Sequence, residues 1–332
     1  MSLRRRFLNL LLRSFEKPAL RRARGAAELR RAFECKARLF FHPPRGSRFR
    51  KGSLHHGGRE VPVLWVGGAQ KGRTGRHSGP EHAGTGAQTW ETEKPAPAGL
   101  ILYFHGGAYV FGSPRTHRAM VARIVALSGL PACLPAYRLA PEHPFPAAFD
   151  DAVLAYRALL ACGYPAGKIM LGGDSAGGGL ALALLAGIRA RGWPRPAGCF
   201  ALSPLTDLTY SGNSFRENAE SELLLPVSRA GEIREMYLRD TPADDPRASP
   251  LFADFTGAPP VFLAVSESEI LLDDTRRLAV RLETQGVRVT VMSDGDLPHV
   301  WPIFHGYLPE ADRTLKQLAG WIRTLSPTPA GN

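Results

Sequence analysis

From residue 99 onward, short runs of apolar residues alternate with longer segments in which apolar residues recur at helical spacing. The apolar runs predict buried strands at Leu100–Phe104, Ala132–Ala136, Lys168–Leu171, Cys199–Leu202, Val261–Val265 and Val287–Met292. The other segments predict helices at 115–128, 148–161, 176–191, 228–239, 272–285 and 309–325. Continuous apolar strands separated by helices are typical of a parallel sheet that is covered on both faces. The pattern therefore predicts an α/β fold.

The first hundred residues follow a different pattern. Helical periodicity predicts helices at 1–14 and 26–41, with Pro18 between them, and an apolar run predicts a strand at Val61–Val66. Residues 67–97 contain almost no aliphatic side chains, so we expect a flexible surface insertion there, between two adjacent strands.

Composition narrows the class of protein. Apolar residues make up 44% of the 332 positions, which is enough for one sizeable core. No apolar run reaches the roughly eighteen residues of a transmembrane helix, and the apolar stretch at the start is too short and broken for a secretory signal. The four cysteines are widely separated and lack zinc-site spacing, which predicts free thiols in a reducing compartment. We therefore expect a cytoplasmic protein whose first residues belong to the fold.

The positive charge is concentrated at the N-terminus. Residues 1–60 contain 17 Lys and Arg against 4 Asp and Glu, whereas the remaining residues contain 25 against 26. A basic amphipathic helix can lie on an anionic membrane surface. The alternative, which we favour, is a solvated face whose apolar stripe packs on the core. Nucleic-acid binding is not expected, because no recognition motif or interleaved aromatic pattern accompanies the charge.

The stretch Gly173-Asp174-Ser175-Ala176-Gly177 joins a predicted strand to a predicted helix. A serine hydroxyl is a poor nucleophile until a base accepts its proton, and a sharp strand-to-helix turn exposes that hydroxyl to a base and a substrate. The alternative is a glycine-rich phosphate loop, but the lysine and the Ser or Thr of such a loop are absent. Ser175 is therefore the candidate nucleophile.

A second glycine pair, Gly106-Gly107, directly follows the strand predicted at Leu100–Phe104. Consecutive glycines let backbone N–H groups point at one spot without obstruction by side chains. Together with Ala176 at the start of the next helix, this pair predicts an oxyanion hole, although an ordinary glycine-rich turn would have the same composition. His105, just before the pair, is interpreted as a residue that organises this loop.

The candidate base and acid come late in the chain. His299 follows the last predicted strand, and His305 is a less favoured rival for the base. Glu269 lies shortly after the strand at Val261–Val265, where a carboxylate could orient the imidazole. Asp273 is the alternative acid, although it also suits the first turn of the following helix.

These motifs occur in the order seen in one known family. Over residues 99–325 the chain resembles the hormone-sensitive-lipase-like family of α/β-hydrolases, in its bacterial esterase branch. The residues that carry the resemblance are His105-Gly106-Gly107, Gly112–His117, Tyr137–Ala147, Gly173–Gly178, Ser203–Asp207 and His299–Trp301. The sequence departs from the family in two places, since Ala108 replaces a frequent third glycine and Glu269 replaces the usual aspartate.

The resemblance implies an α/β-hydrolase fold with a mostly parallel central sheet, flanking helices and a helical cap. The cap would comprise an N-terminal helical segment at 1–55 and an internal segment at 208–240, and the core would comprise 56–207 and 241–326. The implied activity is hydrolysis of small carboxylic esters with short to medium acyl chains, without metal or cofactor. Ser175 would be the nucleophile and His299 the base.

Two other functions remain open. Some relatives bind small molecules without catalysis on the same scaffold, so a receptor is one alternative. Amidase or acyltransferase chemistry on the same serine is the other, because the acyl-enzyme is shared and only the acceptor differs.

Overall fold

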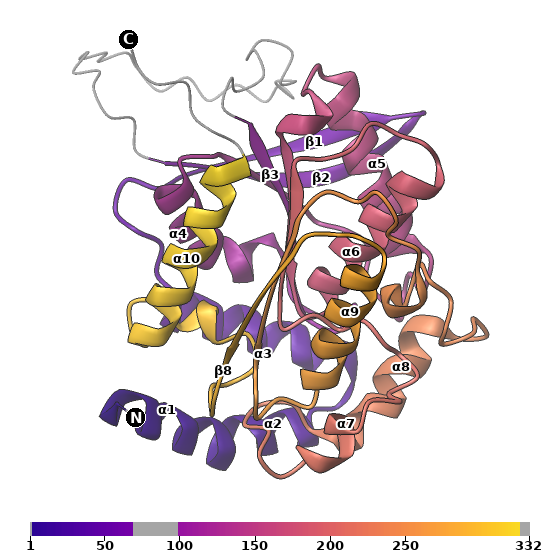
Figure 1. Ribbon diagram of the computed structural model, residues 1–332. Coiled ribbons are helices and arrows are strands. Elements are labelled where there is room, and N and C mark those ends of the chain that lie inside the picture. The colour runs from indigo at the N-terminus through magenta and orange to yellow at the C-terminus, as the bar shows by residue number, and fades with distance from the viewer. Residues whose placement is uncertain (1, 69–98, 326–332) are drawn as a thin grey trace.

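The computed structural model describes residues 2–68 and 99–325, which form an eight-stranded sheet with helices on both faces (Figure 1). The strands are β1 (Arg48–His56), β2 (Arg59–Gly67), β3 (Leu100–Phe104), β4 (Ala132–Pro135), β5 (Ile169–Asp174), β6 (Gly198–Leu202), β7 (Val261–Ser266) and β8 (Val289–Asp294). Their order in the sheet is β1-β2-β4-β3-β5-β6-β7-β8. β2 runs antiparallel to β1 and β4, and all other neighbours are parallel. The predicted mostly parallel sheet is confirmed.

Helices cover both faces of this sheet and create two apolar layers. α4 (Pro114–Ser128) and α10 (Pro309–Leu325) lie together on one face, whereas α5 (Ala147–Ala161), α6 (Ala176–Ala190) and α9 (Leu272–Thr284) lie on the other (Figure 1). The side chains of β3 alternate between the layers: Leu102 packs with α6 residues, whereas Ile101 and Tyr103 pack with α4 and α10 residues. A strand that is buried on both faces must be apolar throughout, which explains the uninterrupted runs in the sequence.

β1 is absent from the predicted strands. It is the edge strand of the sheet, and Leu54 is its only buried residue. A strand with one open edge and a solvated face can carry many polar residues, so its apolar pattern is weak. The helix predicted at 26–41 corresponds to Gly25–Phe40, and β1 begins after it within the segment 1–55 that was expected to form part of the cap.

The predicted insertion at 67–97 lies almost entirely outside the described residues. It connects β2 to β3, and β4 lies between these two strands in the sheet. The expectation that the insertion joins two adjacent strands is therefore wrong. Instead, β2 pairs in the antiparallel direction with β4, the strand that follows β3 in the sequence and pairs with it in parallel.

The N-terminal helices gather at one end of the sheet (Figure 1). They are α1 (Leu3–Leu11), a π-helical turn η1 (Leu12–Glu16), α2 (Lys17–Arg22) and α3 (Gly25–Phe40). The helical run that begins with α1 continues through η1 and α2, beyond the predicted limit at 14. Pro18 does not interrupt it, because it occupies the first turn of α2, where its missing N–H is tolerated. Nowhere in the described ranges is a helix both long and apolar enough to cross a membrane.

A segment inserted between β6 and β7 lies at the same end. It contains the short helices α7 (Ser214–Glu217) and α8 (Ala230–Leu238). The ammonium group of Lys17 donates to the carbonyl oxygens of Ala219 and Glu222, at 2.9 and 2.7 Å. The N-terminal helices and the inserted segment are thus in direct contact.

Candidate active site

Ser175 lies at the turn between β5, which ends at Asp174, and α6, which begins at Ala176. Its backbone has φ 52° and ψ −124°, a conformation that side chains rarely adopt. The turn is so tight that a Cβ on Gly173 would lie 2.2 Å from the carbonyl oxygen of Gly177. Glycine is therefore required at both motif positions, because any side chain there would collide with neighbouring backbone. The turn raises the Ser175 hydroxyl above the end of the sheet.

The structure brings Ser175, His299 and Glu269 together from three different loops. Nε2 of His299 lies 2.8 Å from Oγ of Ser175, and Nδ1 lies 2.5 Å from Oε2 of Glu269. All three residues are buried, and Glu269 is 0% exposed. A hydroxyl, an imidazole and a carboxylate in this sequence form the arrangement that activates a serine for acyl transfer.

The surroundings of His299 favour its charged form. Burial alone would lower the pKa of the imidazole, but the Glu269 carboxylate, helped by Glu222, raises it above the ordinary value. Oε1 of Glu269 accepts hydrogen bonds from the Ser203 hydroxyl at 2.8 Å and from the Ser266 N–H at 2.7 Å. These bonds leave Oε2 directed at the imidazole, which fixes the tautomer whose Nε2 can accept the serine proton.

Neither rival residue contacts this group. The carboxylate of Asp273 accepts the N–H of Ser214 at 2.9 Å and lies in the first turn of α9. His305 follows the 3₁₀ turn Trp301–Phe304; burial lowers its pKa, and the charged groups that act on it are Asp312 on α10 and Arg123 on α4. Of the alternatives that the sequence left open, only Glu269 and His299 lie within hydrogen-bond distance in the chain of contacts that ends at Ser175.

The predicted oxyanion hole needs one correction. The N–H of Gly106 already donates to Oδ1 of Asp174 at 3.1 Å, so it is not free for a ligand. In the described residues, the N–H groups of Gly107 and Ala108 form no hydrogen bond, and both residues have positive φ values of 121° and 54°. Ala176 supplies one of the N–H groups that the start of a helix leaves unpaired. The available donors are therefore Gly107, Ala108 and Ala176.

Asp174 is a functional candidate that the sequence reasoning missed. Its buried carboxylate accepts from the Tyr103 hydroxyl at 2.6 Å and lies 3.1 Å from Nε2 of His117, in addition to its bond with Gly106. Burial would raise the pKa of Asp174, but His117 and the hydrogen bonds lower it. The side chain joins the glycine loop to the nucleophile turn. Only its place beside Ser175 in the motif could have signalled this role.

His105 lies fully inside the loop that it was expected to organise. Its ring stacks on Tyr137, with centroids 4.3 Å apart, and Nδ1 lies 2.8 Å from the carbonyl oxygen of Gly106. Burial, and then the neighbouring His117, lower the pKa of His105 to about 3. The ring is therefore neutral and is not a candidate for the proton transfer that His299 would carry out.

Glu222 is a second buried carboxylate that the sequence did not reveal. It comes from the segment inserted between β6 and β7, and its Oε2 accepts the N–H of Ile270 at 3.2 Å, next to Glu269. Asn218 also donates to the carbonyl oxygen of Glu269 at 2.8 Å. The inserted segment thus holds the turn that bears the acid. A contact of this kind leaves no apolar pattern in the sequence, which is why Glu222 was not predicted.

Within residues 2–68 and 99–325, no group of three or more His, Cys, Asp and Glu side chains is arranged to hold a metal ion. The two carboxylates nearest Ser175, those of Glu269 and Asp174, are already hydrogen-bonded to neighbouring side chains and backbone N–H groups.

Comparison with known proteins identifies the family. The model of the α/β-hydrolase fold family matches residues 101–303, which span the nucleophile turn, the acid and the histidine. The chain belongs to the α/β-hydrolase family. The resemblance to the hormone-sensitive-lipase-like branch is also confirmed, because a crystal structure of an esterase from the bacterial hormone-sensitive lipase family superposes with a TM-score of 0.83. That esterase is 34% identical, and the match covers 98% of this chain and 99% of that one.

Several relatives of this α/β-hydrolase have names that describe an activity. An acetyl-hydrolase of Streptomyces hygroscopicus is 40% identical over 224 residues, which cover 68% of this chain and 75% of that protein. An esterase of Acinetobacter venetianus is 36% identical over 228 residues, with the same coverage. A crystal structure of an esterase/lipase from an uncultured bacterium is 32% identical, with a TM-score of 0.84 and coverage of 99% and 100%. The chain is accordingly an enzyme of the carboxylic ester hydrolase class.

Proposed function

We propose that this enzyme hydrolyses small carboxylic esters through an acyl-enzyme on Ser175. The observation that carries the proposal is the 2.8 Å contact between Oγ of Ser175 and Nε2 of His299, with Glu269 on the other ring nitrogen. His299 would act as general base and Glu269 would orient it. The family and its esterase relatives support the reaction class.

The first half of the reaction forms the ester on the enzyme. Ser175 Oγ attacks the substrate carbonyl carbon while Nε2 of His299 accepts the hydroxyl proton. The carbonyl oxygen becomes an oxyanion, which the N–H groups of Gly107, Ala108 and Ala176 stabilise. Collapse of the tetrahedral intermediate breaks the bond to the alcohol, and the imidazolium returns its proton to that leaving alkoxide.

The second half repeats these steps with water. His299 accepts a proton from water, and the resulting hydroxide attacks the acyl carbon. The same backbone donors hold the second oxyanion. The carboxylic acid leaves as Ser175 recovers its proton from the imidazolium, and the enzyme is ready for another turnover.

Short to medium acyl chains are the substrate class that we propose. Support comes from relatives that are named acetyl-hydrolase and esterase. We further propose that the cap consists of the N-terminal helices and residues 208–240, which meet through Lys17. A cytoplasmic location is proposed because all four cysteines are free thiols, which suit a reducing compartment.

Hydrolysis of p-nitrophenyl butyrate tests the proposal. The wild type should release p-nitrophenol with saturation kinetics, and Ser175→Ala should lose activity by a factor of about 10⁶, as removal of a triad serine does. An inactive wild type would favour the receptor alternative. Turnover that persists in Ser175→Ala would remove the serine from the mechanism.

An acceptor experiment separates hydrolysis from the other serine chemistries. With an added alcohol or amine, a hydrolase should still deliver most of the acyl group to water. An acyltransferase should instead form mainly the new ester or amide. Product ratios measured by chromatography decide between the two.

A further inference from the structure

Helix α1 turns its polar side toward the protein. Arg5 is 9% exposed, and its Nε donates to the carbonyl oxygen of Asp296 at 3.0 Å, while Nη2 donates to that of Gly295. One turn later, the amide of Asn9 donates to the same Asp296 oxygen at 2.9 Å. These two polar side chains fasten α1 to the loop that leads to His299.

The opposite side of this helical segment carries large apolar side chains that face outward. The outer stripe consists of Leu3 (83% exposed), Phe7 (56%), Leu10 (61%), Leu11 (37%) and Phe15 (69%). Within α1 these positions recur at i, i+4, i+7 and i+8, which places them on one face. The expectation that the apolar stripe packs on the core is therefore wrong, although Leu8 and Leu12 on its margin do pack inward.

A helix that lies on a folded protein normally buries its apolar face and exposes its polar face. The reverse orientation here leaves a contiguous apolar surface in contact with water, and such surfaces mark sites of interaction. The inward hydrogen bonds of Arg5 and Asn9 fix this orientation, so the stripe cannot rotate inward without breaking them.

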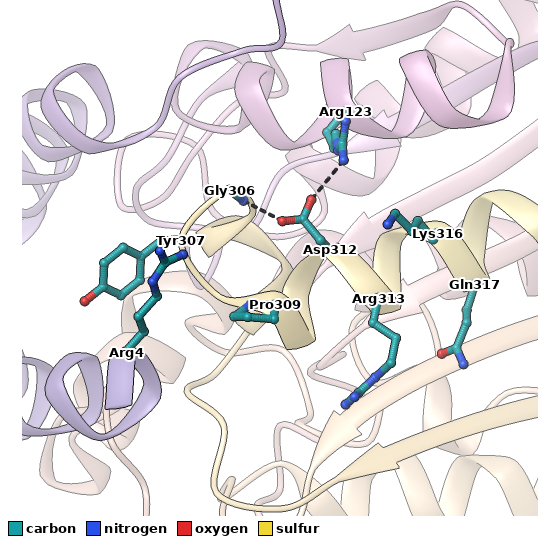
Figure 2. Close-up of a pocket in the computed structure, with 9 residues that line it drawn as sticks. All are labelled: Arg4, Arg123, Gly306, Tyr307, Pro309, Asp312, Arg313, Lys316 and Gln317. Carbon is teal, nitrogen blue, oxygen red and sulfur yellow. Dashed lines mark hydrogen bonds and ion pairs between the residues drawn. The ribbon is translucent and has the colours of Figure 1, made fainter. Parts of the chain in front are cut away.

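Two exposed cations flank the stripe. Arg4 and Arg6 are exposed on the same helix. Arg4 also lines a cavity of about 530 Å³ between α1, α4 and α10, together with Lys316 and seven other residues that Figure 2 labels. Neither Arg4 nor Lys316 has a hydrogen-bond or ion-pair partner in the described part of the chain.

The single carboxylate of the cavity is already neutralised. Asp312 is paired with Arg123 at 3.1 Å and accepts the N–H of Gly306 at 2.9 Å, as Figure 2 shows. Arg313 is paired with Asp294, which lies outside the cavity lining. The unpaired cations therefore leave the cavity positive, which suits a phosphate group.

We propose that α1 docks this enzyme onto an anionic phospholipid bilayer. The outer stripe enters the boundary between headgroups and acyl chains, and Arg4 with the adjoining cavity binds headgroup phosphates. The charge around the stripe favours an anionic lipid surface over an uncharged apolar partner. Because the inner side of α1 holds the loop before His299, docking places the candidate active site beside the interface where apolar esters accumulate.

Co-sedimentation with vesicles tests this proposal on the full-length protein. The wild type should bind vesicles of equal parts phosphatidylcholine and phosphatidylglycerol, and bind vesicles of phosphatidylcholine alone far more weakly. Ser175→Ala should bind like the wild type, because docking needs no turnover. Failure of the wild type to bind the anionic vesicles would overturn the proposal.

Variants of the stripe and of the cavity provide the matched comparison. The double substitution Phe7→Ser and Leu10→Ser should weaken binding at least about tenfold, since each removes an apolar side chain that would otherwise enter the bilayer. Arg4→Gln with Lys316→Gln should weaken it about tenfold on anionic vesicles only. Val280→Ser, at a 62% exposed apolar site on α9, is the control and should bind normally.

Two further readouts keep the result unambiguous. The stripe variant, the cavity variant and Val280→Ser should hydrolyse p-nitrophenyl butyrate like the wild type without vesicles, which shows that they fold. Sedimentation velocity should show the same species for the wild type and the stripe variant. A wild-type dimer that the stripe substitutions dissociate would show that a second copy covers the stripe, and vesicle binding that survives those substitutions would also overturn the proposal.

Discussion

His299 lies between a hydroxyl that must lose a proton and a carboxylate that must not gain one. The negative charge of Glu269 raises the pKa of the imidazole, so this pKa should appear as the acid limb of the pH profile of kcat/KM. Glu269→Gln removes that charge. We expect the acid limb to move to lower pH, because the imidazolium loses stabilisation, and kcat to fall by about 10⁴.

The matched control for this variant is Asp273→Asn. Asp273 lies four residues further along the chain, but its carboxylate bonds to Ser214 rather than to His299. Its kcat should stay within about threefold of the wild type, with an unchanged acid limb, because a substitution that removes no contact with the candidate triad has a small effect. Equal losses in the two variants would contradict the assignment of Glu269.

Asp174 offers a second residue-scale prediction. Its carboxylate holds the N–H of Gly106, and the next two backbone N–H groups are the proposed oxyanion donors. Asp174→Ala should therefore lower kcat by about 10²-fold while KM changes little, because the donors matter most when the oxyanion forms. Asp174→Asn keeps one oxygen acceptor and should recover part of the loss. A variant that changes KM alone would assign Asp174 to substrate binding.

At the scale of elements, α1 supports the histidine loop through Arg5. Arg5→Met keeps much of the side-chain volume but removes the donor to the Gly295 carbonyl oxygen and leaves the Asp296 carbonyl oxygen with Asn9 alone. We expect the free energy of unfolding to fall by about 1–3 kcal/mol and kcat to fall with it. Chemical denaturation and esterase assays measure the two effects.

Arg6→Met is the natural comparison for that substitution. Arg6 is the next residue on α1 and is exposed, so its replacement should leave both stability and turnover within experimental error. Comparable losses in the two variants would show that the charge of the helix, and not the contact of Arg5 with the loop, is what matters.

The elements differ in how well the sequence predicts them. Strands such as β3 and β7 are buried on both faces, so their composition alone marks them. The edge strand β1 has one buried residue and leaves no such mark. The periodicity of α1 predicts an amphipathic helix, but which side meets the protein depends on carbonyl groups almost 300 residues away. No local pattern contains that information.

The same distinction applies to the site. The order of the motifs predicted the three side chains that meet at Ser175. Gly106 was predicted as an oxyanion donor, but its N–H is occupied by Asp174, which lies 68 residues later. Glu222 escaped prediction for the same reason, since its contact with Ile270 spans 48 residues. Contacts of this kind follow from the fold rather than from composition.

At the scale of the whole molecule, the basic N-terminal segment has two uses. Some of its cations face inward onto the loops of the candidate site: Arg30 donates to the carbonyl oxygens of Val110 and Ala140, as Arg5 does at the histidine loop. Others, including Arg4, remain without partners in the described chain and lie beside the outer stripe. The cations of the first 60 residues thus include some that hold the loops of the candidate site in place and others that belong to the proposed lipid-binding surface.

The central claim is that Ser175 is the nucleophile of this esterase. The most direct measurement is reaction with a fluorophosphonate, followed by digestion and mass spectrometry of the labelled peptide. We expect one adduct, on the peptide that contains Ser175, and slow labelling when His299 is replaced by alanine. No adduct, or an adduct on a different residue, would show that Ser175 is not the nucleophile.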